Sequence, residues 1–210
     1  MRISHKHKFI FLSKPKCAST SIRAALDPYS DIISDDRIPH YHHHVPASIL
    51  KKHFDKMSWN WSGYFKFTCV RNPWDMLVSV YSFGKPDQEG NYFWQERIYD
   101  SNSRMTFKEW ILKGRSWDFK QAKLLDDLSA YTLPYYILDE NDNCLVDCIV
   151  SVENLENDLK YVSSKINIEI KEFHLNTSKH KSYREYYDEQ TKKITASLFE
   201  KDIEYGKYVF

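Results

Sequence analysis

The sequence has little glycine and no long apolar run, and each shortage excludes a class of protein. Only 5 of the 210 residues are glycine, and no long polar stretch is present, which argues against disordered linkers. No stretch approaches the roughly 18 apolar residues of a membrane-spanning helix. The first apolar run, Phe9–Leu12, is short and follows a basic start, so we expect no signal peptide.

The chain also has few cysteines and almost no net charge. The four cysteines form no C-x-x-C pair, which argues against a zinc site, and we expect reduced thiols in the core. The formal net charge is +1, so the chain gives no sign of a nucleic-acid partner, and local basic patches must hold any anion. Aromatic residues make up 16%; most will lie in the core, and some can stack on sugars.

The length of 210 residues fits one domain, residues 1–210, with a sizeable core. Without an apolar span, we expect a cytoplasmic protein with no transmembrane segment. Peripheral contact with a membrane stays open. The sequence gives no sign of the oligomeric state.

What the chain does contain is two anion-binding patterns. The first is K-P-K-C-A-S-T-S-I-R-A-A-L, residues 14–26, directly after an apolar strand. A helix that begins near Thr20 directs its N–H groups and the positive end of its dipole toward the preceding turn. That turn also supplies lysines and hydroxyl groups. We expect an anion to be bound by Lys14, Lys16, Cys17, Ala18, Ser19, Thr20 and Ser21.

The second pattern is F-K-F-T-C-V-R-N-P-W-D-M-L-V-S-V-Y, from residue 65. A strand ends, Arg71 follows, Pro73 suits the first turn of a helix, and Ser79 comes eight positions after Arg71. Arginine offers a planar fork for a phosphate. Two such sites predict a ligand with two separated phosphate-like groups.

These patterns differ from the nucleotide P-loop, which places its lysine after glycines. The order K-C-A-S-T-S resembles the phosphosulfate-binding loop of sulfotransferases, and R-N-P-W-D-M-L-V-S resembles their 3′-phosphate-binding segment. The resemblance implies the donor 3′-phosphoadenylyl sulfate (PAPS), with 3′-phosphoadenosine 5′-phosphate (PAP) as product. It implies that Lys16 acts in catalysis, and that Arg71 and Ser79 bind the 3′-phosphate. Lys179 and Lys181 lie in a polar loop that we expect to close over the donor.

Three further segments extend the resemblance along most of the chain. Y-H-H-H-V (41–45) is similar to the histidine segment of the heparan sulfate 2-O-sulfotransferase branch, V-D-C-I-V-S-V-E-N-L (146–155) to a late strand, and the C-terminal D-I-E-Y-G-K-Y-V-F to the family's ending. The branch consists of carbohydrate sulfotransferases, so the resemblance implies polysaccharide biosynthesis and a hydroxyl on an oligo- or polysaccharide. A small-molecule or lipid-linked acceptor stays open. Animal members of this branch are anchored in the Golgi membrane, so the resemblance implies either a bacterial-type soluble enzyme in the cytoplasm, which we expect, or a trimmed eukaryotic catalytic domain from the Golgi lumen.

The reaction needs a base with a pKa near neutrality, which histidine provides. In an extended segment alternate side chains share a face, so we expect His42 and His44 to point together and His43 to point away. The resemblance selects the same two, with His44 as the base and His42 as its partner or a substrate contact. A metal site made by the three histidines and a chance surface cluster are the alternatives, although sulfuryl transfer requires no metal.

Strands alternating with helices predict an α/β fold of the P-loop-like kind, with a central parallel sheet flanked by helices. Ligands in such sheets bind beyond the carboxyl ends of the strands, where both anion patterns lie. The polar stretch 85–104 is a candidate substrate loop. We expect strands at 7–13, 64–70, 135–138 and 144–150, the last two as a hairpin, and helices at 20–27, 46–56, 74–83, 106–113, 119–130, 153–166 and 187–205.

Two other functions are compatible with an anion-binding α/β chain. A small-metabolite kinase would need the late lysine of the nucleotide P-loop, which is missing. A non-catalytic nucleotide- or glycan-binding module would have no need of Lys16 and His44.

Overall fold

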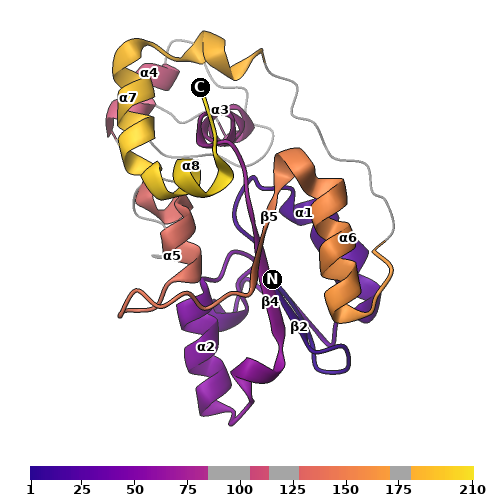
Figure 1. Cartoon of the computed structure of the whole chain (residues 1–210). Helices are drawn as coiled ribbons and strands as arrows, with labels where there is room; N and C mark the ends of the chain where they lie inside the picture. The colour runs from indigo at the N-terminus through magenta and orange to yellow at the C-terminus, as the bar shows by residue number, and fades with distance from the viewer. Residues whose placement is uncertain (85–104, 114–127, 171–180) are drawn as a thin grey trace. The chain divides into compact units, whose positions relative to one another are not determined.

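The structure is a computed structural model, and it describes residues 1–84, 105–113, 128–170 and 181–210. The chain divides into two compact units (Figure 1). The first comprises Met1–Arg71 and Leu133–Asn176, and the second comprises Asn72–Thr132 and Thr177–Phe210. The first unit contains the whole sheet, so each unit is described by itself.

The sheet of the first unit has five strands in the order β3-β1-β2-β4-β5. Three of these strands are parallel: β2 pairs with β4, and β4 pairs with β5. The short first strand runs antiparallel to both of its neighbours. The expected parallel sheet is therefore confirmed for three strands, and the sheet as a whole is mixed. The strands are β1 (Arg2–Ser4), β2 (Phe9–Leu12), β3 (Ile32–Ile33), β4 (Phe65–Val70) and β5 (Cys148–Ser151).

Helices cover both faces of this sheet. Helices α1 and α6 lie on one side, and α2 and α5 lie on the other (Figure 1). Side chains alternate between the faces of a strand, so Ile10 and Leu12 pack with Leu50 and Phe54 of α2 in one buried cluster. The helices are α1 (Ser19–Leu26), α2 (Ala47–Lys56), α5 (Leu133–Ile137) and α6 (Leu155–Ile166).

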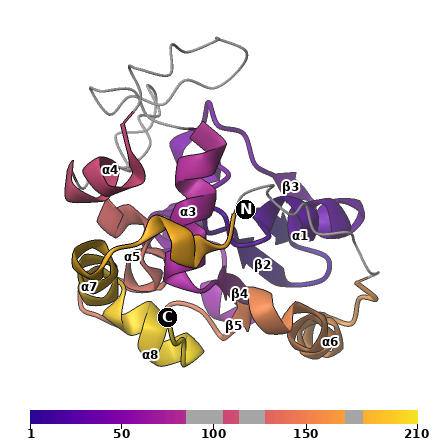
Figure 2. The ribbon, with the colours of Figure 1, turned by 90° about the horizontal axis from the view of Figure 1, so that it is seen from above.

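The second unit is helical in its described residues (Figure 2). Helix α7 begins with a capping box in which the Asp188 side chain accepts a hydrogen bond from the Thr191 N–H, which satisfies an N–H that the helix leaves unpaired. The expected helix at 187–205 is two helices, because the chain breaks at Phe199. The α-helices here are α3 (Pro73–Gly84), α4 (Phe107–Lys113), α7 (Glu189–Leu198) and α8 (Glu200–Gly206).

One expected element is wrong. Residues 135–138 were expected to be a strand, but Leu133–Ile137 is helix α5. Pro134 suits the first turn of a helix, and the prediction of a strand did not take this proline into account. A single bridge between Leu138 and Cys144 is the part of the expected hairpin that forms. The candidate substrate loop and residues 114–127 lie outside the described residues.

The cysteines are all in the described part of the chain, and none forms a disulfide. Cys17 and Cys69 are buried as expected, whereas Cys144 is exposed, so the expectation of four core thiols is wrong for that residue. Among the described helices, none has the length and apolar character needed to cross a membrane.

Candidate active site

The loop between β2 and α1 has an unusual backbone. Lys16 and Ala18 both adopt left-handed conformations, with φ of 57° and 55°, which cost a residue with a side chain about 1 kcal/mol or more. Ala18 is the N-cap of α1, and alanine has no side-chain oxygen to cap the first turn. A turn of this kind directs successive N–H groups inward and suits an anion. The loop therefore has the backbone of an anion site.

Two lysines of this loop lie in different surroundings. Lys14 is completely buried, with its Nζ 3.9 Å from Cys17 Sγ. Lys16 is half-buried, and burial together with the charge of Arg71 lowers its pKa to about 8. The loop thus holds cationic groups away from water, where a bound anion would be strongly attracted.

Arg71 connects the end of β4 to the same loop. One of its terminal nitrogens, Nη1, donates a hydrogen bond to the Lys16 carbonyl at 3.0 Å. Two positive side chains close together repel each other, and a bound anion would offset that repulsion. Lys16 and Arg71 therefore lie beyond the carboxyl ends of neighbouring parallel strands, where the sequence predicted the two anion patterns, and the hydrogen bond joins the two loops.

Two other predicted donor-binding residues belong to the second unit. Ser79 is buried in α3, which belongs to the second unit. Lys181 also belongs to the second unit, is exposed, and lies 3.8 Å from a carboxylate oxygen of Glu185. Lys179 lies outside the described residues. Their roles in donor binding stay predictions.

The histidine segment is a turn and not an extended strand. It follows a 3₁₀ turn at Pro39–Tyr41. The ring of His43 lies 4.4 Å from that of His42 and 4.1 Å from that of His44, while His42 and His44 are 6.2 Å apart. The expectation that His43 points away from its neighbours is wrong, because the chain turns here and alternation of side chains applies only to extended backbone.

Hydrogen bonds fix this segment to the end of β2. The Nδ1–H of His44 donates to the Ser13 carbonyl at 2.6 Å, and the Ser13 hydroxyl donates to the His43 carbonyl at 2.8 Å. Ser13 directly precedes Lys14, so the histidines are attached to the beginning of the anion loop. This connection places a histidine cluster beside the predicted donor site within one unit.

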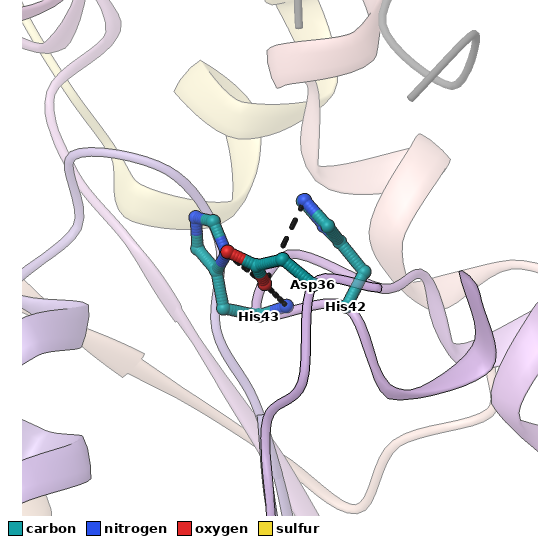
Figure 3. A group of neighbouring side chains, drawn as sticks. All are labelled: Asp36, His42 and His43. Carbon is teal, nitrogen blue, oxygen red and sulfur yellow. Dashed lines mark hydrogen bonds and ion pairs between the residues drawn. The ribbon is translucent and has the colours of Figure 1, made fainter. Parts of the chain in front are cut away.

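Asp36 joins the histidines as a residue that the sequence reading missed. Its carboxylate accepts hydrogen bonds from the His43 ring Nδ1 and from the His43 backbone N–H, the latter at 3.0 Å (Figure 3). His42 Nε2 lies 3.8 Å from the same oxygen. No spacing rule pointed to Asp36, because it meets the histidines through the turn and not through a regular element.

The hydrogen bonds also define which ring nitrogen carries the proton. His42 Nδ1 accepts from the His44 N–H at 3.1 Å, so the proton of neutral His42 is on Nε2. His43 donates from Nδ1 to Asp36, and His44 donates from Nδ1 to a carbonyl. In neutral His43 and His44 the lone pair is therefore on Nε2, the arrangement of a general base.

The pKa values of the three histidines are all lowered, chiefly by burial. The pKa of His43 falls to about 4, and burial holds that of His44 well below its ordinary value. Asp36 raises the pKa of His42 and of His43 against this trend. Burial opposes ionisation of Asp36, but the hydrogen bonds from His43 outweigh it and lower the pKa of the carboxyl. At neutral pH the cluster consists of neutral imidazoles beside a carboxylate.

An open groove of about 780 Å³ lies beside this cluster in the first unit. Its wall is mixed: polar and charged side chains, among them Arg23, Asp36, Tyr41 and His43, alternate with apolar ones contributed by Ile32, Ile33 and Ile38. The Arg37 guanidinium is paired with Asp35, at 2.7 Å. The volume of the groove lies in the range of small-molecule binding sites.

Comparison with known sequences identifies the family. A sequence model described as "Sulfotransferase family" matches residues 1–208. The chain belongs to the sulfotransferase family. The chain is also similar to a protein of Archaeoglobus fulgidus that is itself named as uncharacterized, with 28% identity over 141 residues. The aligned region covers 67% of this chain and 98% of that protein.

Members of the sulfotransferase family generally use PAPS as the sulfuryl donor. The residues at the end of β2 fit such a ligand, because the left-handed turn, the uncapped start of α1, and the cations Lys16 and Arg71 all favour an anion. When bound, PAPS supplies an activated sulfuryl group. Lys16 and the first N–H groups of α1 would hold its 5′-phosphosulfate.

A metal site at the histidines does not fit the hydrogen bonds that the ring nitrogens make. Asp36, His42 and His43 offer ligand atoms within 4.8 Å of one another. A metal on His42 Nε2 would need the ring proton on Nδ1, where the His44 N–H already donates. The carboxylate of Asp36 instead accepts hydrogen bonds from the ring and the backbone N–H of His43.

Proposed function

We propose that the chain transfers the sulfuryl group of PAPS to a hydroxyl of a carbohydrate acceptor. The observation that carries this proposal is the connection of three parts in one unit: the anion loop, Arg71 on the Lys16 carbonyl, and the histidine segment hydrogen-bonded to Ser13. A strand–loop–helix anion site beside neutral histidines suits transfer of a charged group to a hydroxyl. The P-loop-like arrangement expected from the sequence belongs to this proposal.

Lys16 has the central electrostatic role. Its ammonium group neutralises the charge that grows on the leaving phosphate oxygen, and backbone N–H groups of α1 assist it. The half-buried position of Lys16 strengthens that attraction compared with a lysine in water. Lys14, Cys17, Ala18, Ser19, Thr20 and Ser21 complete the donor loop, and Arg71 with Ser79 binds the 3′-phosphate.

A histidine from the segment 42–44 takes the proton of the acceptor hydroxyl. On sequence grounds the base is His44 and His42 is its partner. The lone pair on His44 Nε2 suits this role, whereas both nitrogens of His42 are engaged, one by the His44 N–H and one toward Asp36. His42 thereby contributes by holding the turn.

A thermal-shift experiment tests the donor class directly. PAP should raise the melting temperature, because a ligand that binds only the folded state stabilises it. AMP, which lacks the 3′-phosphate, should stabilise less, and ATP with magnesium should stabilise much less than PAP. Stronger stabilisation by ATP with magnesium than by PAP would contradict the proposal and favour a kinase.

A further inference from the structure

The guanidinium of Arg23 lies against the first turn of helix α1, next to the anion loop. Its Nε donates a hydrogen bond to the Ser19 carbonyl at 3.2 Å, and its Nη2 donates one to Thr20 Oγ1 at 3.4 Å. Ser19 and Thr20 are the first two residues of α1. The Arg23 side chain therefore points back along the helix and adds a positive charge at the end that already attracts anions.

This cation has no carboxylate within ion-pair distance. Arg23 is half-buried, and in the described part of the chain it forms no ion pair. Its neighbour Arg2, by contrast, is paired with Asp27. Burial and then the charge of Arg2 lower the pKa of Arg23, while Asp36 and Asp27 raise it. A guanidinium withdrawn from water without an ion pair is costly, and an anion bound in the neighbouring loop would offset that cost.

The contact with Arg23 also orients the hydroxyl of Thr20. A hydroxyl has one hydrogen to donate and two lone pairs, and the Arg23 Nη2 occupies one of these lone pairs. Thr20 is exposed, and among the described residues no protein group accepts its hydrogen. Because Thr20 lies two positions after Ala18, the N-cap of α1, that hydrogen is available to a phosphate or sulfate oxygen bound in the loop.

Arg23 also lies near the histidine segment. It lines the open groove together with His43. Burial is the main cause that lowers the pKa of His42, His43 and His44, and the charge of Arg23 lowers each of them further. One guanidinium thus contacts the first turn of the donor helix and acts electrostatically on the histidines, all within the first unit.

We propose that Arg23 is a positioning residue of the donor site, which holds the Thr20 hydroxyl as a hydrogen-bond donor to the 5′-phosphosulfate of PAPS. This inference rests on the proposed sulfuryl transfer and adds a residue to its donor site, while the roles of Lys16, Arg71 and His44 stay as proposed. An arginine that only stabilised α1 would make the same contact with the Ser19 carbonyl. Its loss would then affect ligands with and without a 5′-phosphate equally.

Calorimetry with two ligands tests the assignment: PAP, and adenosine 3′-phosphate, which lacks the 5′-phosphate. Arg23→Gln should weaken PAP binding by about 10-fold, the loss of one hydrogen bond to a charged group, and leave the affinity for adenosine 3′-phosphate unchanged. Arg23→Lys keeps the charge without the planar fork and should show a smaller loss, again for PAP alone. Lys160→Gln, which removes a cation from an exposed ion pair with Glu156 on α6, is the control expected to match the wild type.

A double-mutant cycle with Thr20 provides the second readout. Thr20→Val keeps the shape of the side chain without the hydroxyl, and it should also weaken PAP binding by about 10-fold. If Arg23 acts through this hydroxyl, Arg23→Gln in the Thr20→Val protein should cost less than about 3-fold, because the group that it orients is already absent. Independent contributions would multiply instead, and the double variant would then lose about 100-fold.

The outcomes separate this inference from the proposed function. Wild-type protein that does not bind PAP would overturn the proposed function, and the inference with it. If the wild type binds PAP, a loss in Arg23→Gln that is equal for both ligands, or that multiplies with the loss in Thr20→Val, overturns the inference and leaves the proposed function standing. If Arg23→Gln does not fold, Arg23→Lys decides by the same comparisons: a loss confined to PAP and absent in the Thr20→Val protein supports the inference, and any other pattern overturns it.

Discussion

Replacing Lys16 with methionine should stabilise the unliganded protein while removing its activity. Burial and the charge of Arg71 lower the pKa of Lys16 from 10.5 to about 8. A change of that size corresponds to about 3 kcal/mol that the folded protein loses by keeping this lysine charged at neutral pH. Methionine keeps an apolar stem without the charge, so Lys16→Met should recover up to about 3 kcal/mol of unfolding free energy.

The pH dependence of this gain has a definite sign. The folded-state pKa of Lys16 lies below the unfolded-state value, so the penalty is complete below pH 8 and disappears as the pH rises to 10.5. Above that range the lysine is neutral in both states. The advantage of Lys16→Met should therefore be largest at neutral pH and shrink across this window.

Thermal unfolding measures the gain in stability, with Lys6→Met as the control because the Lys6 side chain is exposed. For a chain of this size, about 3 kcal/mol corresponds to a rise in Tm of up to about 10 °C. Turnover of Lys16→Met should fall by about 10² to 10³. An unchanged or lower Tm at neutral pH, with Lys6→Met matching the wild type, would refute the argument that Lys16 is held charged at a cost.

Three further predictions concern the donor site, the thiols and the core. Arg71→Ala should weaken PAP binding by about 2 kcal/mol, or roughly 30-fold, and lose the preference for PAP over AMP in calorimetry; a full preference in the variant would reject the phosphate role. Cys144 should react with a maleimide well before Cys17 and Cys69, because it is exposed, they are buried, and burial raises the pKa of Cys69; peptide mapping after a short exposure checks the order. Phe54→Ala should cost about 3 to 5 kcal/mol in denaturant unfolding because its ring is fully buried, and a loss below 1 kcal/mol would show that the cluster around α2 is loosely packed.

The parts of the fold that could be predicted have strong local signals. Strand β4 (Phe65–Val70) is a run of β-favouring residues, and helix α2 (Ala47–Lys56) has apolar residues at helical spacing after a proline. Strands β1 and β3 have three and two residues, too few for a periodic pattern. They exist because they pair along the edge of the sheet, and their antiparallel pairing is what makes the sheet mixed.

The same distinction applies to the site. The placement of Lys16 and Arg71 was predictable because Lys16 lies in the loop after β2, Arg71 directly follows β4, and parallel strands bring their carboxyl ends to the same edge of the sheet. Asp36 was not predictable, since a turn and not a regular element brings it to His43. The alternation rule failed at His42–His44 for the same reason. Positions set by strands follow from the sequence pattern, while positions set by turns depend on tertiary hydrogen bonds.

The most direct test of the central claim is a transfer assay with PAPS that carries an isotopic label in its sulfuryl group. The purified chain is incubated with this donor and a panel of oligo- and polysaccharides, and the products are separated and analysed by mass spectrometry. We predict a labelled sulfate ester on at least one acceptor, formed together with an equal amount of PAP and absent with Lys16→Met. Label that stays in PAPS or appears as free inorganic sulfate, with every acceptor unmodified, would contradict the account.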